Sequence, residues 1–183
     1  MKKLAVFLIA SIGFLAKSQA QIFVADSCSV SFFSATSIED IAAVNTICKP
    51  IMSTDNGEID ISIPNVDFEF KKKLMQEHFN EDYMESDKYP NTIFRGNVNE
   101  KINYTKDGTN NVTVTGKMNM HGVVKTITIP GTVTVQGNSI KLTAKFDLKM
   151  ADYNIKVPSI LGSNVAEQVA ITFRASMKPY KAK

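Results

Sequence analysis

The chain contains 183 residues, with 21 Lys and Arg, 18 Asp and Glu, two His, two Cys and no Trp. The length suggests one domain, and a hydrophobic fraction of 44% with a charged fraction of 21% is ordinary for a globular protein. The composition therefore argues against a disordered, collagen-like or coiled-coil chain.

The first twenty residues have the layout of a secretory signal peptide. Two lysines follow Met1, residues 4–16 form an apolar run, and Ser18-Gln19-Ala20 supplies the small residues of a cleavage site. A run of 13 residues is too short to cross about 30 Å of hydrocarbon as a helix. We therefore predict that residues 1–20 are a cleaved signal peptide and that residues 21–183 form one exported domain, periplasmic or secreted.

Cleavage would also change the charge of the chain. It would remove three lysines and leave 18 basic and 18 acidic residues, so that the net charge becomes zero. Binding to nucleic acid requires a basic face, and the longest basic run that is left, Lys71–Lys73, is typical of a solvated helix face. No second long apolar stretch follows. We therefore expect a protein that binds no nucleic acid and does not span a membrane.

Cys28 and Cys48 form an even pair in a chain that is predicted to be exported. An oxidising compartment permits a disulfide, which would close a loop of about 20 residues and add roughly 3 kcal/mol in the loop-entropy description. Two buried free thiols are the alternative that the spacing leaves open. The spacing contains no Cys-x-x-Cys motif of the kind found in redox and zinc sites.

Residues 38–47 fit two kinds of element. Apolar residues recur there at every third position and Ser37 could cap a helix, whereas the β-branched side chains favour a strand, which is our prediction. Three isoleucines then alternate with polar residues over 58–63 and predict a strand. Farther along, apolar residues from Phe70 to Phe79 fall at helical spacing, and we predict a short helix over residues 69–80.

The second half of the chain alternates between apolar and polar residues. This period of two is the mark of strands with one dry and one wet face. Tight turns are predicted between the strands, because Gly, Asn, Asp and Pro cluster there. The predicted strands are 112–120, 126–129, 140–150 and 169–177, and the predicted turns are Asp55-Asn56-Gly57, Asp107-Gly108, Pro130-Gly131 and Gln136-Gly137-Asn138.

Strands joined in this way predict a mainly β, antiparallel meander. Its apolar face must be covered, either by forming a sandwich or by closing into a barrel. About eight strands would close into a barrel that can just hold one small ligand. The periodicity alone does not choose between the two architectures.

Four consecutive stretches of the chain carry a resemblance to a known family. They are a helical segment ending in Tyr89-Pro90, the Phe-bearing strand Thr92-Ile-Phe-Arg-Gly96, the strand Val112 to Gly122, and Thr126-Ile-Thr-Ile-Pro130. Together they resemble the YceI-like family of bacterial exported proteins, over about residues 27–178. The resemblance implies a lipocalin-like antiparallel β-barrel with a helix near one end. It also implies an apolar tunnel for an amphiphile such as a polyisoprenoid or an isoprenoid quinone.

The sequence departs from the family in one place. The first strands of the family are plainer, whereas here they carry Cys28 and Cys48. This departure leaves open how the first hairpin is arranged and whether the disulfide forms.

Catalytic and metal chemistry find little support in the sequence. A metal site needs three or four ligands, and His78 and His121 lie far from each other and from both cysteines. We interpret His78 as a helix-face residue and His121 as a strand-end residue at a turn. The acidic residues between Glu77 and Asp87 lack the rhythm of a calcium loop, and no nucleophile elbow or phosphate loop is present. We expect no metal, no cofactor other than a bound isoprenoid lipid or quinone, and no enzymatic activity.

Our leading hypothesis is an exported protein that holds an isoprenoid-type amphiphile in an apolar barrel, for sequestration or transport in the cell envelope. The alternatives are a non-enzymatic scaffold without bound lipid and a small hydrolase or isomerase that would use His121. Alternation along the strands and spacing on the helix predict the residues that line the tunnel. They are Phe70, Leu74, Phe79, Phe94, Val112, Val114, Met118, Met120, Ile140, Leu142, Phe146, Leu148, Ile171 and Phe173.

Overall fold

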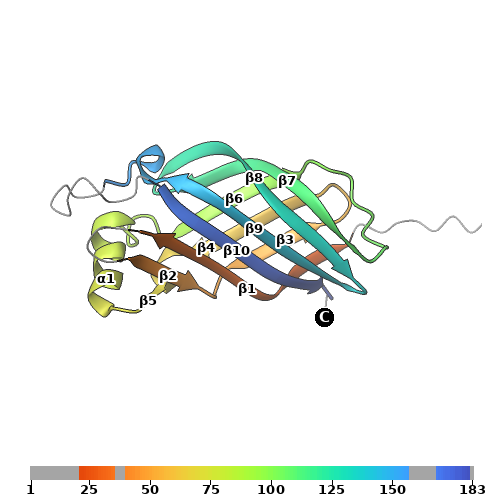
Figure 1. Ribbon diagram of the computed structural model, residues 1–183, viewed down its shortest axis with the longest axis horizontal. Helices are drawn as coiled ribbons and strands as arrows, with labels where there is room; N and C mark the ends of the chain where they lie inside the picture. Colours follow the sequence, from red (N-terminus) through yellow and green to blue (C-terminus); the bar gives the residue numbers. More distant parts are fainter. Residues whose placement is uncertain (1–20, 36–39, 157–167, 182–183) are drawn as a thin grey trace, which may run out of the picture.

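The computed structural model describes residues 21–35, 40–156 and 168–181 (Figure 1). The predicted signal peptide, residues 1–20, lies outside the described residues. Within them, no helix has the length and apolar character needed to cross a bilayer. The elements, in chain order, are β1 (Ile22–Ser34), β2 (Ile41–Asn45), β3 (Lys49–Ser53), β4 (Glu58–Pro64), η1 (Asn65–Asp67), β5 (Glu69–Phe70), α1 (Lys73–His78), η2 (Phe79–Tyr83), β6 (Asn91–Val98), β7 (Gly108–Met120), β8 (Val123–Gln136), β9 (Ser139–Lys149), η3 (Met150–Tyr153) and β10 (Gln168–Pro179).

The first and last strands close the sheet into a barrel. β1 and β10 pair antiparallel from Phe23 opposite Pro179 to Phe33 opposite Ala170, with an irregularity between Ala25 and Ser27. Eight strands follow one another around the barrel in the order β1, β10, β9, β8, β7, β6, β4 and β3, and neighbouring pairs are antiparallel. The predicted antiparallel barrel is confirmed, and the sandwich alternative is excluded.

The alternating segments of the sequence form strands as expected. Residues 58–63 lie in β4, 112–120 in β7 and 169–177 in β10. The segment 140–150 matches β9, except that Met150 begins the η3 turn. Alternation predicts these strands well because each has one face inside the barrel and one face in water.

Buried apolar side chains of five strands gather near the end of the barrel opposite α1 (Figure 1). Five side chains that are at most 4% exposed meet there from β1, β3, β8, β9 and β10. Phe23 lies opposite Met52, and Ile140 lies opposite both Val135 and Met177. Large apolar side chains therefore fill this end of the barrel, as they fill the core of an ordinary domain.

β2 and β3 act as one interrupted strand along the edge of β1. Both pair antiparallel with β1 in the same register, β3 through Ser53 opposite Ile22 and β2 through Asn45 opposite Val30. At the interruption, the backbone N–H of Ile47 donates to Oδ1 of Asn45 at 2.8 Å, which replaces a ladder bond by a local turn. The predicted strand within 38–47 is thus confirmed as β2, although residues 38–39 lie outside the described residues.

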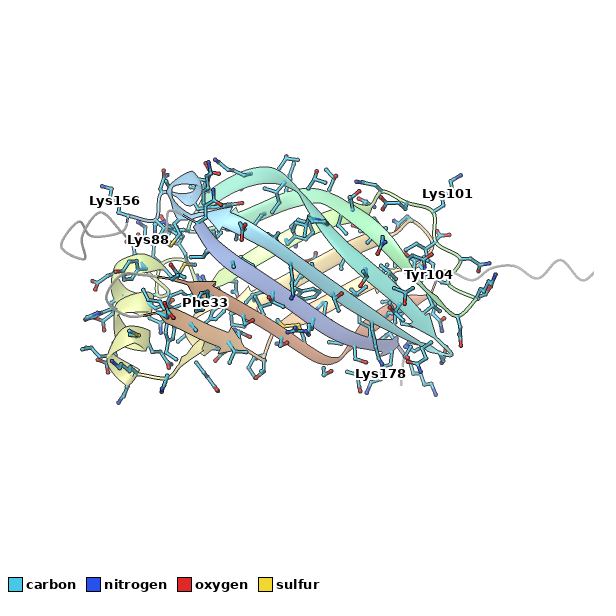
Figure 2. The ribbon with its side chains drawn as sticks, viewed as in Figure 1. Phe33, Lys88, Lys101, Tyr104, Lys156 and Lys178 are labelled. Atoms are coloured by element: carbon cyan, nitrogen blue, oxygen red, sulfur yellow. A yellow bond between two sulfur atoms is a disulfide. The ribbon has the colours of Figure 1, made fainter. Side chains whose placement is uncertain are left out.

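A disulfide bond joins Cys28 to Cys48 across this interruption (sulfur atoms yellow in Figure 2). The Cα atoms are 5.8 Å apart, and both residues are buried. The alternative of two free thiols is excluded in this structure. The bond ties β1 to the β2–β3 strand at a place where regular backbone hydrogen bonds are missing.

The tight turn predicted at Pro130-Gly131 is wrong, because β8 runs through both residues without a break. β7 pairs with β8 on both sides of this point, with Thr113 opposite Pro130. Pairing of β8 with β9 begins only at Gly131, so the missing N–H of proline falls where β8 has no partner on that side. A Cβ atom at Gly131 would lie 2.6 Å from the carbonyl oxygen of Thr143, and glycine therefore allows β9 to approach.

The helix is also placed differently from the predicted 69–80. Residues 69–70 form β5, in which Phe70 lies opposite Ala43 of β2. The α-helix begins at Lys73 and passes at Phe79 into a π-helical turn that ends at Tyr83. Pairing with β2 keeps Phe70 extended, so the helix starts later and presents a different face to the barrel.

We predict that replacing both cysteines, as Cys28→Ser with Cys48→Ser, lowers the free energy of unfolding by about 3 kcal/mol, because the denatured chain loses the constraint of a 20-residue loop. Urea denaturation measures the change. The oxidised parent protein should be the more stable form, and the reduced parent should unfold together with the double variant. Equal stability of the oxidised parent and the variant would contradict the prediction.

Candidate functional site

The end of the barrel nearest α1 contains a cavity of about 370 Å³. Inward side chains of β1, β4 and β6–β10 form its wall, and α1 and η2 lie across its end (Figure 1). Almost all of these side chains are apolar. The same strands whose inward side chains fill the interior near the other end therefore enclose a cavity at this end.

Most of the residues predicted to line a tunnel do lie on this wall. They come from six different elements, and their chain positions span more than 100 residues. Contact with a ligand stays a prediction for all of them. The twelve on the wall are Phe70, Phe79, Phe94, Val112, Val114, Met118, Met120, Leu142, Phe146, Leu148, Ile171 and Phe173.

Two predicted residues lie elsewhere. Leu74 is 61% exposed on the outer side of α1, and Met75 and His78 border the cavity in its place. The reason is that Phe70 does not belong to the helix, so the predicted helical phase does not apply. Ile140 is buried, but near the opposite end of the barrel. It faces a second hollow of about 510 Å³ there, which Tyr104 also lines (Figure 2).

The sequence analysis missed several wall residues. Ile59, Ile61 and Ile63 line the cavity, and their alternation was visible. Alternation could also have identified Val30, Phe32 and Ser34 on β1, which we did not assign. By contrast, no periodic signal marks Phe68, Tyr83 and Met84, since they lie at or directly after the ends of η1 and η2. The wall residues that were missed on irregular elements are Asn65, Phe68, Tyr83, Met84 and Ile155.

Four phenylalanines form a cluster at the α1 end of the cavity. The ring centroids of Phe70 and Phe79 are 5.1 Å apart, and Phe32 lies between 5.5 and 5.7 Å from Phe68, Phe70 and Phe79. Contacts of this kind contribute about 0.5–1.5 kcal/mol each beyond burial of area. The cluster therefore holds β5 and η2 against β1 and closes one side of the cavity.

Phe94 lines the cavity, and its ring lies against two glycines. Gly96 on β6 lies directly opposite Gly116 on β7. A Cβ atom at Gly116 would come within 2.7 Å of the Phe94 ring and within 2.6 Å of the Cα atom of Gly96. The absence of side chains on both glycines thus leaves the space that the Phe94 ring occupies, and the ring is 3% exposed.

The polar groups of the wall are few. Among the described wall residues there is no Asp, Glu, Lys or Arg, and the titratable ones are His78 and Tyr83. Burial, with a smaller effect of Asp82, raises the pKa of Tyr83 above its usual range, so its hydroxyl stays neutral. Asn65 is fully buried and well bonded: Nδ2 donates to the carbonyl of Tyr89 at 2.6 Å, and Oδ1 accepts from Oγ1 of Thr92 at 2.9 Å.

His121 lies beside the cavity but not on its wall. As predicted, it sits at a turn, between β7 and β8. Nδ1 donates to the carbonyl oxygen of Tyr153 at 3.0 Å, and Nε2 lies 2.8 Å from Oε2 of Glu85. Its ring also packs on Tyr89 with centroids 4.7 Å apart. His121 thereby ties the β7–β8 hairpin to the segment after η2 and to η3.

The described residues contain no group of three or more His, Cys, Asp or Glu side chains that could hold a metal ion. The chemistry that the cavity itself offers is burial of an apolar molecule. No charged side chain of the described wall is placed to react with such a molecule.

We predict that Gly116→Ala lowers the free energy of unfolding by about 1–3 kcal/mol, because the new methyl group overlaps the carbonyl oxygen of Arg95 at 2.4 Å and displaces the Phe94 ring. Urea denaturation measures the loss. Lys117→Ala, an exposed neighbour on the same strand, should change stability by less than about 0.5 kcal/mol. If both variants had the same stability, the close approach of β6 and β7 would not matter as we describe.

The fold resembles those of several solved structures. A polyisoprenoid binding domain from Saccharophagus degradans, implicated in plant cell wall breakdown, superposes with a TM-score of 0.74 at 15% identity, covering 86% of this chain and 98% of that one. BcnA of Burkholderia cenocepacia gives 0.67 at 20% identity, over 81% and 95% of the two chains. The YceI protein of Campylobacter jejuni gives 0.55 at 15% identity, over 81% and 85%. At these identities the likeness establishes the fold.

A search of curated protein sequences found no match. The sequence profile of the YceI-like domain, however, matches residues 15–177, which is most of the chain. This match agrees with the barrel, with the helix at one end and with the resemblance that the sequence carries. The chain therefore belongs to the YceI-like family.

Proposed function

We propose that this protein is an exported lipid-binding protein. It holds an isoprenoid-type amphiphile, either a polyisoprenoid or an isoprenoid quinone, in the barrel cavity and sequesters or transports it in the cell envelope. The observation that carries the proposal is the apolar cavity of about 370 Å³ between α1 and the packed end of the barrel. Cavities of this size are typical of small-molecule sites.

An occupant would offset the cost of leaving this cavity empty. Cavities made in protein cores cost about 24 cal/mol per Å³, and even a fraction of that value amounts to several kcal/mol here. A protein that served only as a scaffold would gain stability from a larger side chain at a small inward position such as Ala144. The size of the hollow therefore favours a carrier over a scaffold without ligand.

The energetics agree with retention of a long hydrocarbon chain. Each buried CH₂ group contributes about 0.8 kcal/mol, so about 15 buried carbons would give on the order of 12 kcal/mol. Immobilisation of the ligand and of side chains costs several kcal/mol or more of this binding free energy. Micromolar to nanomolar binding follows without any covalent step.

Three further observations support the details of the proposal. The Saccharophagus degradans neighbour is a polyisoprenoid binding domain, which favours an isoprenoid as the ligand class. The signal-peptide layout of residues 1–20 supports export. The Cys28–Cys48 disulfide agrees with an oxidising compartment. Because His121 lies off the cavity wall, the proposal is binding without turnover.

Native mass spectrometry tests the proposal. The protein is exported into a bacterial periplasm, purified without detergent, and analysed by organic extraction of the same sample. We expect an excess mass of several hundred daltons that resolves into one isoprenoid class and is recovered chemically unchanged. A bare protein mass, repeated after incubation with envelope lipids, would overturn the carrier proposal in favour of the scaffold.

A charge placed in the wall should abolish retention of the lipid. Phe146→Asp would bury an unpaired carboxylate against the ligand, and we expect affinity to fall by at least about 100-fold. Lys145→Asp, at the exposed neighbouring position on β9, is the control and should retain the lipid. Circular dichroism establishes that each variant is folded. If Phe146→Asp does not fold, Phe146→Ala replaces it, with an expected loss of about tenfold. A folded variant that binds as the parent does would contradict the assignment of the wall.

A further inference from the structure

One buried polar group of the cavity has no partner within the described part of the chain. Ser34 is the last residue of β1, lies on the cavity wall and is 3% exposed. Its Oγ atom is buried and makes no hydrogen bond. Asn65 and Thr92, the other fully buried polar residues of the wall, bond to each other.

The described residues around Ser34 do not account for a hydroxyl group. Ser34 lies opposite Ile41 on β2, and the preceding pair is Phe33 opposite Ala170 on β10. The nearby inward positions are apolar, so that alanine or valine would pack there at least as well. A buried hydroxyl without a partner is destabilising, and almost all such groups in proteins are hydrogen-bonded.

We infer that the Ser34 hydroxyl binds the polar group of the ligand, and that this group is a neutral oxygen, either a hydroxyl or a carbonyl. The inference rests on the proposed function and specifies the chemistry of the same cavity. A serine hydroxyl can donate to a carbonyl or exchange donor and acceptor roles with an alcohol. Either partner would satisfy the group that the protein leaves unpaired.

The composition of the described wall favours a neutral group. The described wall residues include no cationic Lys or Arg and no Asp or Glu. A buried phosphate or carboxylate would therefore lose its hydration without gaining a counter-charge, which is unfavourable by several kcal/mol in general. A neutral oxygen loses far less on burial, and Ser34 restores its hydrogen bond.

The position of Ser34 also orients the ligand. Ser34 ends β1 at the side of the barrel where Phe32 meets Phe79 of η2. Farther inside lie the apolar side chains of Val133 and Leu142, which face each other on β8 and β9. The oxygen of the ligand therefore lies at the α1 end, and its hydrocarbon chain extends toward the packed end.

The test compares three probes that share one hydrocarbon chain. The protein is purified from the periplasm and freed of lipid, and calorimetry measures the binding of geranylgeraniol, of the hydrocarbon that lacks its hydroxyl, and of geranylgeranyl diphosphate. We expect the alcohol to bind about tenfold more tightly than the hydrocarbon, which is the worth of one satisfied hydrogen bond. Ser34→Ala should remove this difference by weakening the alcohol alone, and its melting temperature should not fall.

A matched variant and the remaining outcomes separate the possibilities. Ser31→Ala, the same change on the alternate face of β1, should leave the preference for the alcohol unchanged. Equal binding of alcohol and hydrocarbon to the parent protein would overturn the inference and leave the proposed function intact. Tighter binding of the diphosphate that is insensitive to Ser34→Ala would also overturn it. Failure of all three probes to bind would overturn the proposed function itself.

Discussion

Pairing of β1 with β10 is the constraint on which the rest of the structure depends. It removes the free edges of the sheet, and it fixes the width of the barrel, because eight strands enclose only a narrow interior. The filling of that interior then depends on the sizes of the inward side chains. At one end Phe23, Met52 and Met177 fill it. Toward α1, small inward residues such as Gly131 and Ser34 leave room, so one closed sheet contains both a core and a cavity.

The α1 end of the barrel is held in shape by contacts between irregular segments. Three non-glycine residues there, Glu85, His121 and Asn154, have positive φ angles of 45°, 51° and 57°. Such conformations persist only where the surroundings enforce them. His121 supplies that enforcement, since it bonds both to Glu85 and to the carbonyl of Tyr153, the residue before Asn154. Together with the phenylalanine cluster, these contacts preform the cavity mouth, so that binding a ligand requires little ordering of the chain.

How much the sequence predicts depends on whether the deciding interaction is local. Alternation predicts β7, β9 and β10 because inside and outside are set residue by residue, and it therefore finds most of the wall residues that these three strands supply. The turn predicted at Pro130-Gly131 is wrong because the preference of these residues for turns is a local property. Pairing with β7, a contact that the local sequence does not show, keeps β8 extended there. The prediction that Leu74 lines the cavity is wrong for a similar reason. Phe70 pairs with Ala43 and so lies outside the helix, and the helix therefore turns a different face to the barrel than the spacing from Phe70 predicts. The unpaired hydroxyl of Ser34 is invisible in the sequence, since serine is common on strands and only the fold shows that no partner reaches it.

In the proposed role, different residues of the wall determine affinity and selectivity. Burial of hydrocarbon is non-directional and grows with the area removed from water, so the apolar wall favours long chains and does not distinguish among them. Directional bonds are needed to select a chemical class, and Asn65 and Thr92 have already used theirs on each other. That leaves the few polar groups near α1 to discriminate, and among them the hydroxyl of Ser34 is buried on the wall without a hydrogen bond in the described chain. A carrier built in this way selects a class of neutral amphiphiles rather than a single compound, because one hydroxyl recognises an oxygen atom and the wall accepts the chain attached to it.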